Sequence, residues 1–218
     1  MPKVYISPSS QFANAGLAPF TTEGAEMSLI ASSLMLFLVM DGRFTAKCST
    51  PDMTDVYEKA RESNDFGAEI HVAIHSNAGG GKGTEVYAYG AKTHSERLAI
   101  ALYTKIAPLS PGADRGVKYD TKLIEVGDCV KATSALIELG FHDNSMDAAW
   151  LADCIQEIAT GLYHGICDYF AYEYRDTSAA PIVDHDIYLS VRVLQSRSED
   201  LIKSIISMGY ACMALDLA

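Results

Sequence analysis

The sequence predicts an α/β protein: a three-layer domain with a mainly parallel sheet and helices on both faces, plus a small C-terminal βαβ unit. Strand-like runs alternate with helical patterns over most of the chain, which favours a parallel sheet between helices. Glu69–His75 (EIHVAIH) alternates its side chains between two faces, as a strand does. Ser134–Leu139 (SALIEL) is almost continuously apolar, which is typical of a parallel strand covered on both faces.

The first quarter of the chain predicts two strands and two helices. Lys3–Ser7 is a β-branched and aromatic run that ends before Pro8, and residues 8–22 are loop-like. An apolar helix is expected over Glu23–Met40, closed by Asp41-Gly42. A second strand is expected at Phe44–Cys48, and Pro51–Asn64 carries apolar side chains at the spacing of a surface helix.

After the strand at Glu69–His75 comes a glycine-rich loop that regular structure does not tolerate. Thr84–Tyr89 predicts a further strand and Thr93–Ile106 an amphipathic helix, after which residues 108–114 break the pattern. Following the apolar strand at Ser134–Leu139, one long helix is expected over Asp147–Phe170.

Composition suggests that the chain has one main domain, residues 1–171, and a linker at 172–186 rich in small, charged and proline residues. Residues 187–218 then read as strand, helix and strand, a unit too small to hold a core alone. We therefore expect this unit to pair with another copy of itself or to dock on the main domain.

Charge and hydropathy exclude several classes of partner. The net charge of −11 argues against nucleic-acid binding and against a polybasic membrane anchor. The apolar segment Met27–Met40 has 14 residues, whereas a membrane span needs about 20. It follows acidic residues, and the N-terminus has no signal-peptide pattern, so we expect a buried helix. The five scattered cysteines form no CxxC pair and are expected to be reduced.

Three polar residues are predicted to converge at one edge of the sheet. His75 and Glu138 stand at or near the carboxyl ends of two strands, just before glycine-containing loops, and Glu23 opens a helix after a long loop. Ligands of open α/β sheets bind outside the carboxyl ends of the strands. Glu138 is also a carboxylate inside an apolar strand, and burying an unpaired charge there is costly. These residues are the candidate site.

Four segments of the chain resemble the zinc-dependent N-acetylmuramoyl-L-alanine amidases of the Amidase_3 type, over roughly residues 3–170. They are SPSSQ at Ser7–Gln11, TTEGAEMSLIAS at Thr21–Ser32, HVAIHSNAGGGKGTEVY at His71–Tyr87 and ALIELGFHDN at Ala135–Asn144. The resemblance implies a hydrolase that acts on cell-wall peptidoglycan with zinc as its cofactor. The missing signal peptide then slightly favours a phage endolysin over a host autolysin, with release to the wall by another route.

The resemblance also assigns roles to the three candidates. Glu23 and His75 would be zinc ligands, and Glu138 would be the catalytic acid and base. A catalytic zinc site has three protein ligands and one water, which the metal acidifies towards neutral pH. The bond cleaved would be the amide between N-acetylmuramic acid and the L-alanine of the stem peptide.

One position departs from the family pattern. Relatives read PSTQ-x-H-N after the first strand, whereas here Ala13 stands where the first histidine ligand belongs. Three explanations remain open. Gln11, Asn14 or His142 supplies the third ligand, the protein is a metal-free binder of peptidoglycan, or a metal is held by two ligands or in another place.

Two further features have less specific interpretations. His71 lies on the same strand face as His75 but four residues earlier, too far to share a metal easily, so a structural role is expected. The C-terminal unit weakly resembles one half of a SPOR-type repeat, a module that binds glycan strands without stem peptides.

Overall fold

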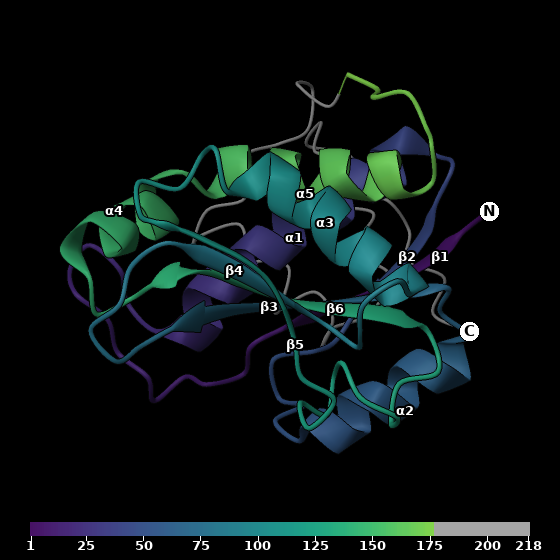
Figure 1. Ribbon diagram of the computed structural model, residues 1–218, viewed down its shortest axis with the longest axis horizontal. Helices are drawn as coiled ribbons and strands as arrows, with labels where there is room; N and C mark the ends of the chain where they lie inside the picture. Colours follow the sequence, from purple (N-terminus) through teal and green to yellow (C-terminus); the bar gives the residue numbers. More distant parts are fainter. Residues whose placement is uncertain (177–218) are drawn as a thin grey trace, which may run out of the picture. The chain divides into compact units, whose positions relative to one another are not determined.

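The computed structural model describes residues 1–176, which form six strands and five helices (Figure 1). The predicted C-terminal βαβ unit at 187–218 and most of the linker lie outside the described residues. The elements are β1 Lys3–Pro8, α1 Glu23–Asp41, β2 Thr45–Cys48, α2 Val56–Phe66, β3 Ile70–Asn77, β4 Thr84–Ala88, α3 His94–Ile106, β5 Asp114–Tyr119, β6 Thr133–Phe141, α4 Ser145–Asp153 and α5 Ile155–Tyr169.

The strands form one mixed sheet in the order β2-β1-β3-β6-β4-β5. Four neighbouring pairs are parallel, and only β4 with β6 is antiparallel. The predicted α/β class with a mainly parallel sheet is therefore confirmed. β5 was not predicted, because its sequence, DRGVKY, carries charged residues and a glycine with φ of 78° and lies at the sheet edge.

The two faces of the sheet differ in character. Helices α1, α3 and α5 cover one face, and α2 lies on the other (Figure 1). The apolar side chains of β1 and β3, including Val4, Ile6, Val72 and Ile74, enter the core beneath the three helices. Alternate residues point to the opposite face. That face carries a smaller apolar cluster and the buried polar groups of the candidate site.

Helix α1 is a core helix. Thr22 caps its start by accepting a hydrogen bond from the N–H of Ala25, and Gly42, with φ of 72°, closes its end. By length and composition alone α1 could span a membrane. Of its 19 residues, however, 13 are buried, and it packs against α5 and three strands. These contacts account for its apolar sequence.

Two helix boundaries differ from the prediction. The single helix expected at Asp147–Phe170 is two helices, α4 and α5, separated at Cys154, whose φ of −112° and ψ of 31° are not helical. The apolar periodicity continues through Cys154, so the sequence gives no signal of the break between the two helices. Helix α2 begins at Val56 rather than Pro51, because the Asp55 side chain caps it by accepting from the N–H of Tyr57.

Candidate functional site

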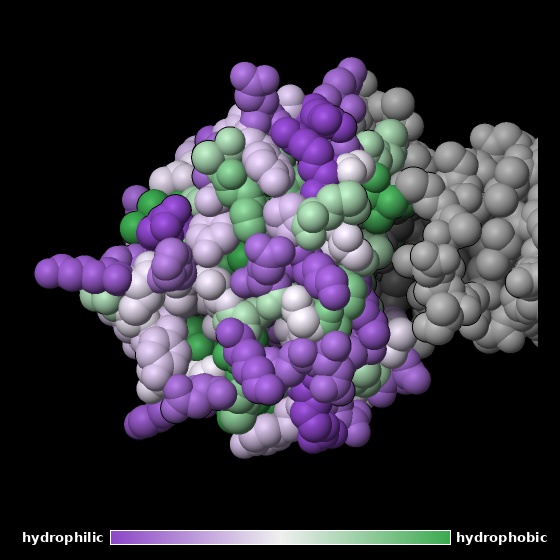
Figure 2. Space-filling model, turned by 90° about the vertical axis from the view of Figure 1, so that its right-hand side faces the viewer, coloured by the Kyte–Doolittle hydropathy of each residue, from purple (hydrophilic) through white to green (hydrophobic). Residues whose placement is uncertain are grey.

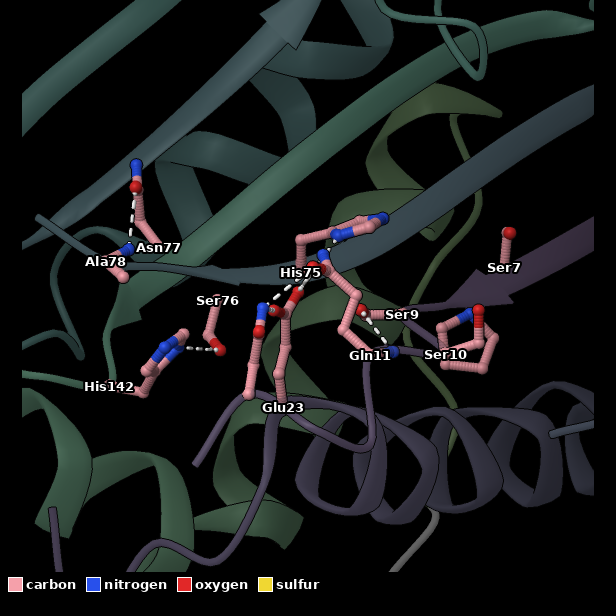
Figure 3. Close-up of polar contacts among 12 residues, drawn as sticks. Ser7, Ser9, Ser10, Gln11, Glu23, His75, Ser76, Asn77, Ala78 and His142 are labelled. Atoms are coloured by element: carbon pink, nitrogen blue, oxygen red, sulfur yellow. Dashed lines mark hydrogen bonds and ion pairs between the residues drawn. The ribbon is translucent and has the colours of Figure 1, made fainter. Parts of the chain in front are cut away.

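The three predicted site residues lie at the carboxyl edge of the central strands. His75 of β3 is in register with Glu138 of β6, so the two side chains project from the same face of adjacent parallel strands. Glu23, the first residue of α1, reaches the same place from the other side of the sheet edge. Its Oε1 lies 3.1 Å from Nδ1 of His75 (Figure 3).

Glu23 and His75 form a partly buried ion pair. Glu23 is 2% exposed. Burial opposes ionisation of Glu23, but the hydrogen bond and the charge of His75, together with hydrogen bonds from Asn14 and Ser9, outweigh burial and lower the pKa of the carboxyl. Burial likewise lowers the pKa of His75, yet hydrogen bonds with Glu125 and Glu23 raise it to about 10. Without a metal, a positive imidazolium therefore sits between carboxylates at neutral pH.

The environment of Glu138 favours the protonated form of its carboxyl, so that it is partly protonated near neutral pH. Burial, with the negative charges of Glu23 and Glu85, outweighs the attraction of His75 and raises the pKa of Glu138 to about 7. Glu85 lies directly opposite Glu138 in the antiparallel pair of β4 with β6. Among the described residues, Oε2 of Glu138 has no hydrogen-bond partner. A buried oxygen without a partner in a native protein calls for a functional or structural explanation.

Side-chain amides surround Glu23 where the family pattern has its first histidine. Asn14 Nδ2 donates to Oε2 of Glu23 at 3.0 Å, and Gln11 Nε2 donates to Oε1 at 3.4 Å. Asn14 also donates to Oε1 of Gln11 at 2.7 Å. Ala13 is exposed and its methyl group offers no ligand atom.

His142 is not placed to replace that histidine. Its Nδ1 lies 2.9 Å from Oγ of Ser76 (Figure 3). Its ring stacks on Phe20 with centroids 5.5 Å apart. Of the three candidate substitutes, only the two amides lie beside Glu23.

Two side chains of the site, Glu23 and His75, are suitable zinc ligands. A carboxylate oxygen and an imidazole nitrogen are both common zinc ligands, and here they face each other. Within residues 1–176, however, no three His, Cys, Asp or Glu side chains are grouped closely enough to hold a metal ion. The site thus has one protein ligand fewer than catalytic zinc usually takes.

Glu125 is a residue of the site that was not among the sequence-predicted candidates; it lies between β5 and β6 and is 2% exposed. Its Oε2 is 3.4 Å from Nε2 of His75, and its Oε1 is 3.2 Å from Nε2 of His71. Burial opposes ionisation of Glu125, but hydrogen bonds from both histidines outweigh it and lower the pKa. The signal was the one that marked Glu138: a carboxylate inside an apolar run, here Leu123 to Val126.

His71 is buried, as a structural role requires. Its ring stacks on Tyr5 with centroids 5.1 Å apart. His71 makes no hydrogen bond with Glu23 or His75. Glu125 connects the two histidines by contacting both of them.

The loops that border the site are joined by backbone hydrogen bonds. Gly79 and Gly80, after β3, have φ of 115° and 78°, and both N–H groups donate to Oδ2 of Asp143 at 2.7 and 2.8 Å. Residues other than glycine rarely adopt such φ values. Asp143 follows β6, so this contact fixes the two strand ends relative to each other.

Comparison with known proteins gives a consistent result. The family model described as N-acetylmuramoyl-L-alanine amidase, Amidase_3, matches residues 21–168, a span that begins after Ala13. The N-acetylmuramoyl-L-alanine amidase CwlM of Bacillus licheniformis is 30% identical over 179 residues, covering 78% of this chain and 69% of that protein. A sporulation-specific N-acetylmuramoyl-L-alanine amidase of Bacillus subtilis is 25% identical, covering 99% of this chain and 85% of that protein.

Solved structures share the fold. The catalytic domain of the amidase CwlV from Paenibacillus polymyxa superposes with a TM-score of 0.70 at 22% identity, covering 79% of this chain and all of that one. The catalytic domain of the CD27L endolysin, which targets Clostridium difficile, gives a TM-score of 0.61 at 23% identity, covering 77% and 98%. The chain belongs to the Amidase_3 family of N-acetylmuramoyl-L-alanine amidases.

Proposed function

We propose that this family member hydrolyses the amide between N-acetylmuramic acid and L-alanine in peptidoglycan, with Glu138 as the group that transfers protons. The observation that carries the proposal is the carboxyl of Glu138 near the carboxyl end of β6: its pKa is raised to about 7, and its buried Oε2 has no hydrogen-bond partner within residues 1–176. A general acid and base works best when its pKa is near the working pH. Glu138 could thus accept a proton from water and return it to the leaving amine.

Glu23 and His75 would hold the zinc ion that the family uses. When bound, zinc polarises an amide carbonyl and lowers the pKa of its water. The chain's own groups orient this site: Glu23 is fixed by the amides of Asn14 and Gln11, and His75 by Glu23 and Glu125. With two protein ligands, we expect zinc to bind more weakly than at a three-ligand site.

A second function, binding peptidoglycan without cleaving it, is favoured by one observation. Ala13 removes a ligand atom, and Asn14 and Gln11 already satisfy both oxygens of Glu23 by hydrogen bonding. A site satisfied in this way is stable without metal. The fold and the strand-edge site would then serve recognition alone.

Metal analysis and wall lysis separate the two functions. We would measure zinc content and the lysis of purified cell walls for the unaltered protein, Ala13→His, Glu138→Gln and the control Glu157→Gln, an exposed carboxylate on α5. If the chain is an enzyme, it lyses walls with zinc, Glu138→Gln lowers the rate by about 10²–10⁴-fold, and Glu157→Gln leaves the rate unchanged.

The opposite results define the alternative. If the unaltered protein binds walls without zinc or lysis, and Ala13→His gains both, the binding function is correct for this chain. If lysis is unchanged in Glu138→Gln, the role of Glu138 is wrong. The setting of an endolysin or autolysin remains our expectation for where the protein meets its substrate, the cell wall.

A further inference from the structure

Glu125 touches the predicted zinc ligand His75 on the ring nitrogen that faces away from Glu23. Nδ1 of His75 lies 3.1 Å from Glu23, and Nε2 lies 3.4 Å from Oε2 of Glu125. The two ring nitrogens of an imidazole point in different directions, so a partner on one fixes the direction of the other. Glu125 therefore influences the direction in which Nδ1 of His75 points.

The carboxylate of Glu125 is itself held in place. Its side chain is 2% exposed, and Oε1 accepts a hydrogen bond from the hydroxyl of Ser7 in β1 and faces Nε2 of His71 at 3.2 Å. Residues from two strands thus fix one oxygen and leave the other for His75. Rotation of this carboxylate would break contacts with both Ser7 and His71.

We propose that Glu125 is a positioning residue that accepts the Nε2–H of His75 and so keeps Nδ1 directed at Glu23, ready for a metal ion. This inference rests on the proposed function, in which Glu23 and His75 are the ligands. Carboxylates behind ligand histidines orient the ring and fix its tautomer, and their loss typically lowers metal affinity 10–100-fold. Ser7 and His71 make no hydrogen bond with His75 themselves and act by holding the carboxylate of Glu125 in place.

A merely structural role for Glu125 makes a different prediction. If Glu125 only stabilises the buried cluster, its replacement changes the free energy of unfolding but leaves Nδ1 of His75 directed at Glu23 and leaves zinc affinity unchanged. The matched control is Asp41→Asn. Asp41 is also a buried carboxylate in a hydrogen-bond network, with Arg43 and Tyr163, remote in sequence and contacts from the site.

The first test uses metal-free protein and NMR of ¹⁵N-labelled histidines. Glu125→Gln keeps the side-chain shape but has one acceptor oxygen, which cannot serve both His71 and His75. We expect the ¹⁵N signal of His75 Nδ1, which faces Glu23, to shift in Glu125→Gln through loss of the fixed ring orientation and to stay unchanged in Asp41→Asn, with His142 as an internal reference. An unchanged His75 signal in folded Glu125→Gln would overturn the proposal. Should Glu125→Gln not fold, Glu125→Asp, which retracts the carboxylate, is expected to give the same shift.

The second test measures zinc affinity by competition with a chelator, in the unaltered chain and in the chain carrying Ala13→His. We expect Glu125→Gln to weaken zinc binding about 10–100-fold in whichever chain binds it, and Asp41→Asn to leave affinity unchanged. Equal affinities for Glu125→Gln and its parent contradict the inference. If no chain binds zinc, the proposed zinc site fails, while the metal-free NMR result still decides the role of Glu125.

Discussion

At the scale of single residues, the site gathers carboxylates at a cost in stability. Glu138 has a buried oxygen without a hydrogen-bond partner in the part of the chain that the structure describes, and it lies near two other acidic side chains, Glu23 and Glu85. Ionising it in the folded protein is therefore unfavourable. Functional sites commonly retain such strain when the chemistry requires the group.

The pKa of Glu138 predicts a pH-dependent stability. It rises from 4.5 to about 7 on folding, so the folded protein binds this proton more tightly than the unfolded chain. The stability that the folded protein gains from holding this proton is fully present below the unfolded pKa of 4.5. It is lost as pH rises through the folded pKa of about 7. Glu138→Gln, which cannot ionise, should be more stable than its parent by roughly 3 kcal/mol at about pH 8 and equal to it by about pH 4. Urea unfolding of metal-free protein at both pH values measures this, and a difference independent of pH would contradict it.

At the scale of elements, Asp147 of α4 holds the strand ends that carry the site. Its Oδ2 accepts the N–H of Gly83, before β4, at 2.6 Å and the N–H of Phe141, at the end of β6, at 2.9 Å. Asp147 is fully buried. One carboxylate therefore fixes a helix, a loop and a strand in a common position.

Removing that carboxylate should destabilise the protein. Asp147→Ala leaves two buried N–H groups without their acceptor, and we expect a loss of about 2–4 kcal/mol in the free energy of unfolding. Asp153→Ala, on the exposed last residue of the same helix, is the control and should change stability by less than about 0.5 kcal/mol. Denaturant unfolding compares the two, and similar losses would argue against the role of Asp147.

At the scale of the whole molecule, Met1–Ile182 form a first compact unit, of which the structure describes residues 1–176. This first unit contains the core between the sheet and helices α1, α3 and α5. Its surface in the view of Figure 2 is largely hydrophilic, with apolar side chains in small separate groups, in keeping with the net charge of −11.

A chain ending after Ile182 should keep this fold. Because the core and candidate site lie within the first unit, we expect its thermal unfolding midpoint to stay within a few degrees of the full chain's. Circular dichroism measures this, and a large drop would show that the rest of the chain supports the core. Sedimentation of both forms also separates the two expectations for the C-terminal unit: with self-pairing only the full chain self-associates, and with docking on the main domain neither form does.

The sequence by itself determined the family, the α/β class, the core helix α1, and the strands that carry His75 and Glu138. These features depend on local periodicity, on turn residues and on motifs within a few positions of each other. The tertiary structure decided the antiparallel place of β4, the edge strand β5, the amides around Glu23 and the contact of Glu125 with His75. Glu125 and His75 are 50 residues apart, and only the pairing of β3 with β6 and the packing of the segment before β6 bring them together. Contacts of this kind leave no periodic trace in the sequence, because either partner alone is one carboxylate or one histidine among apolar neighbours.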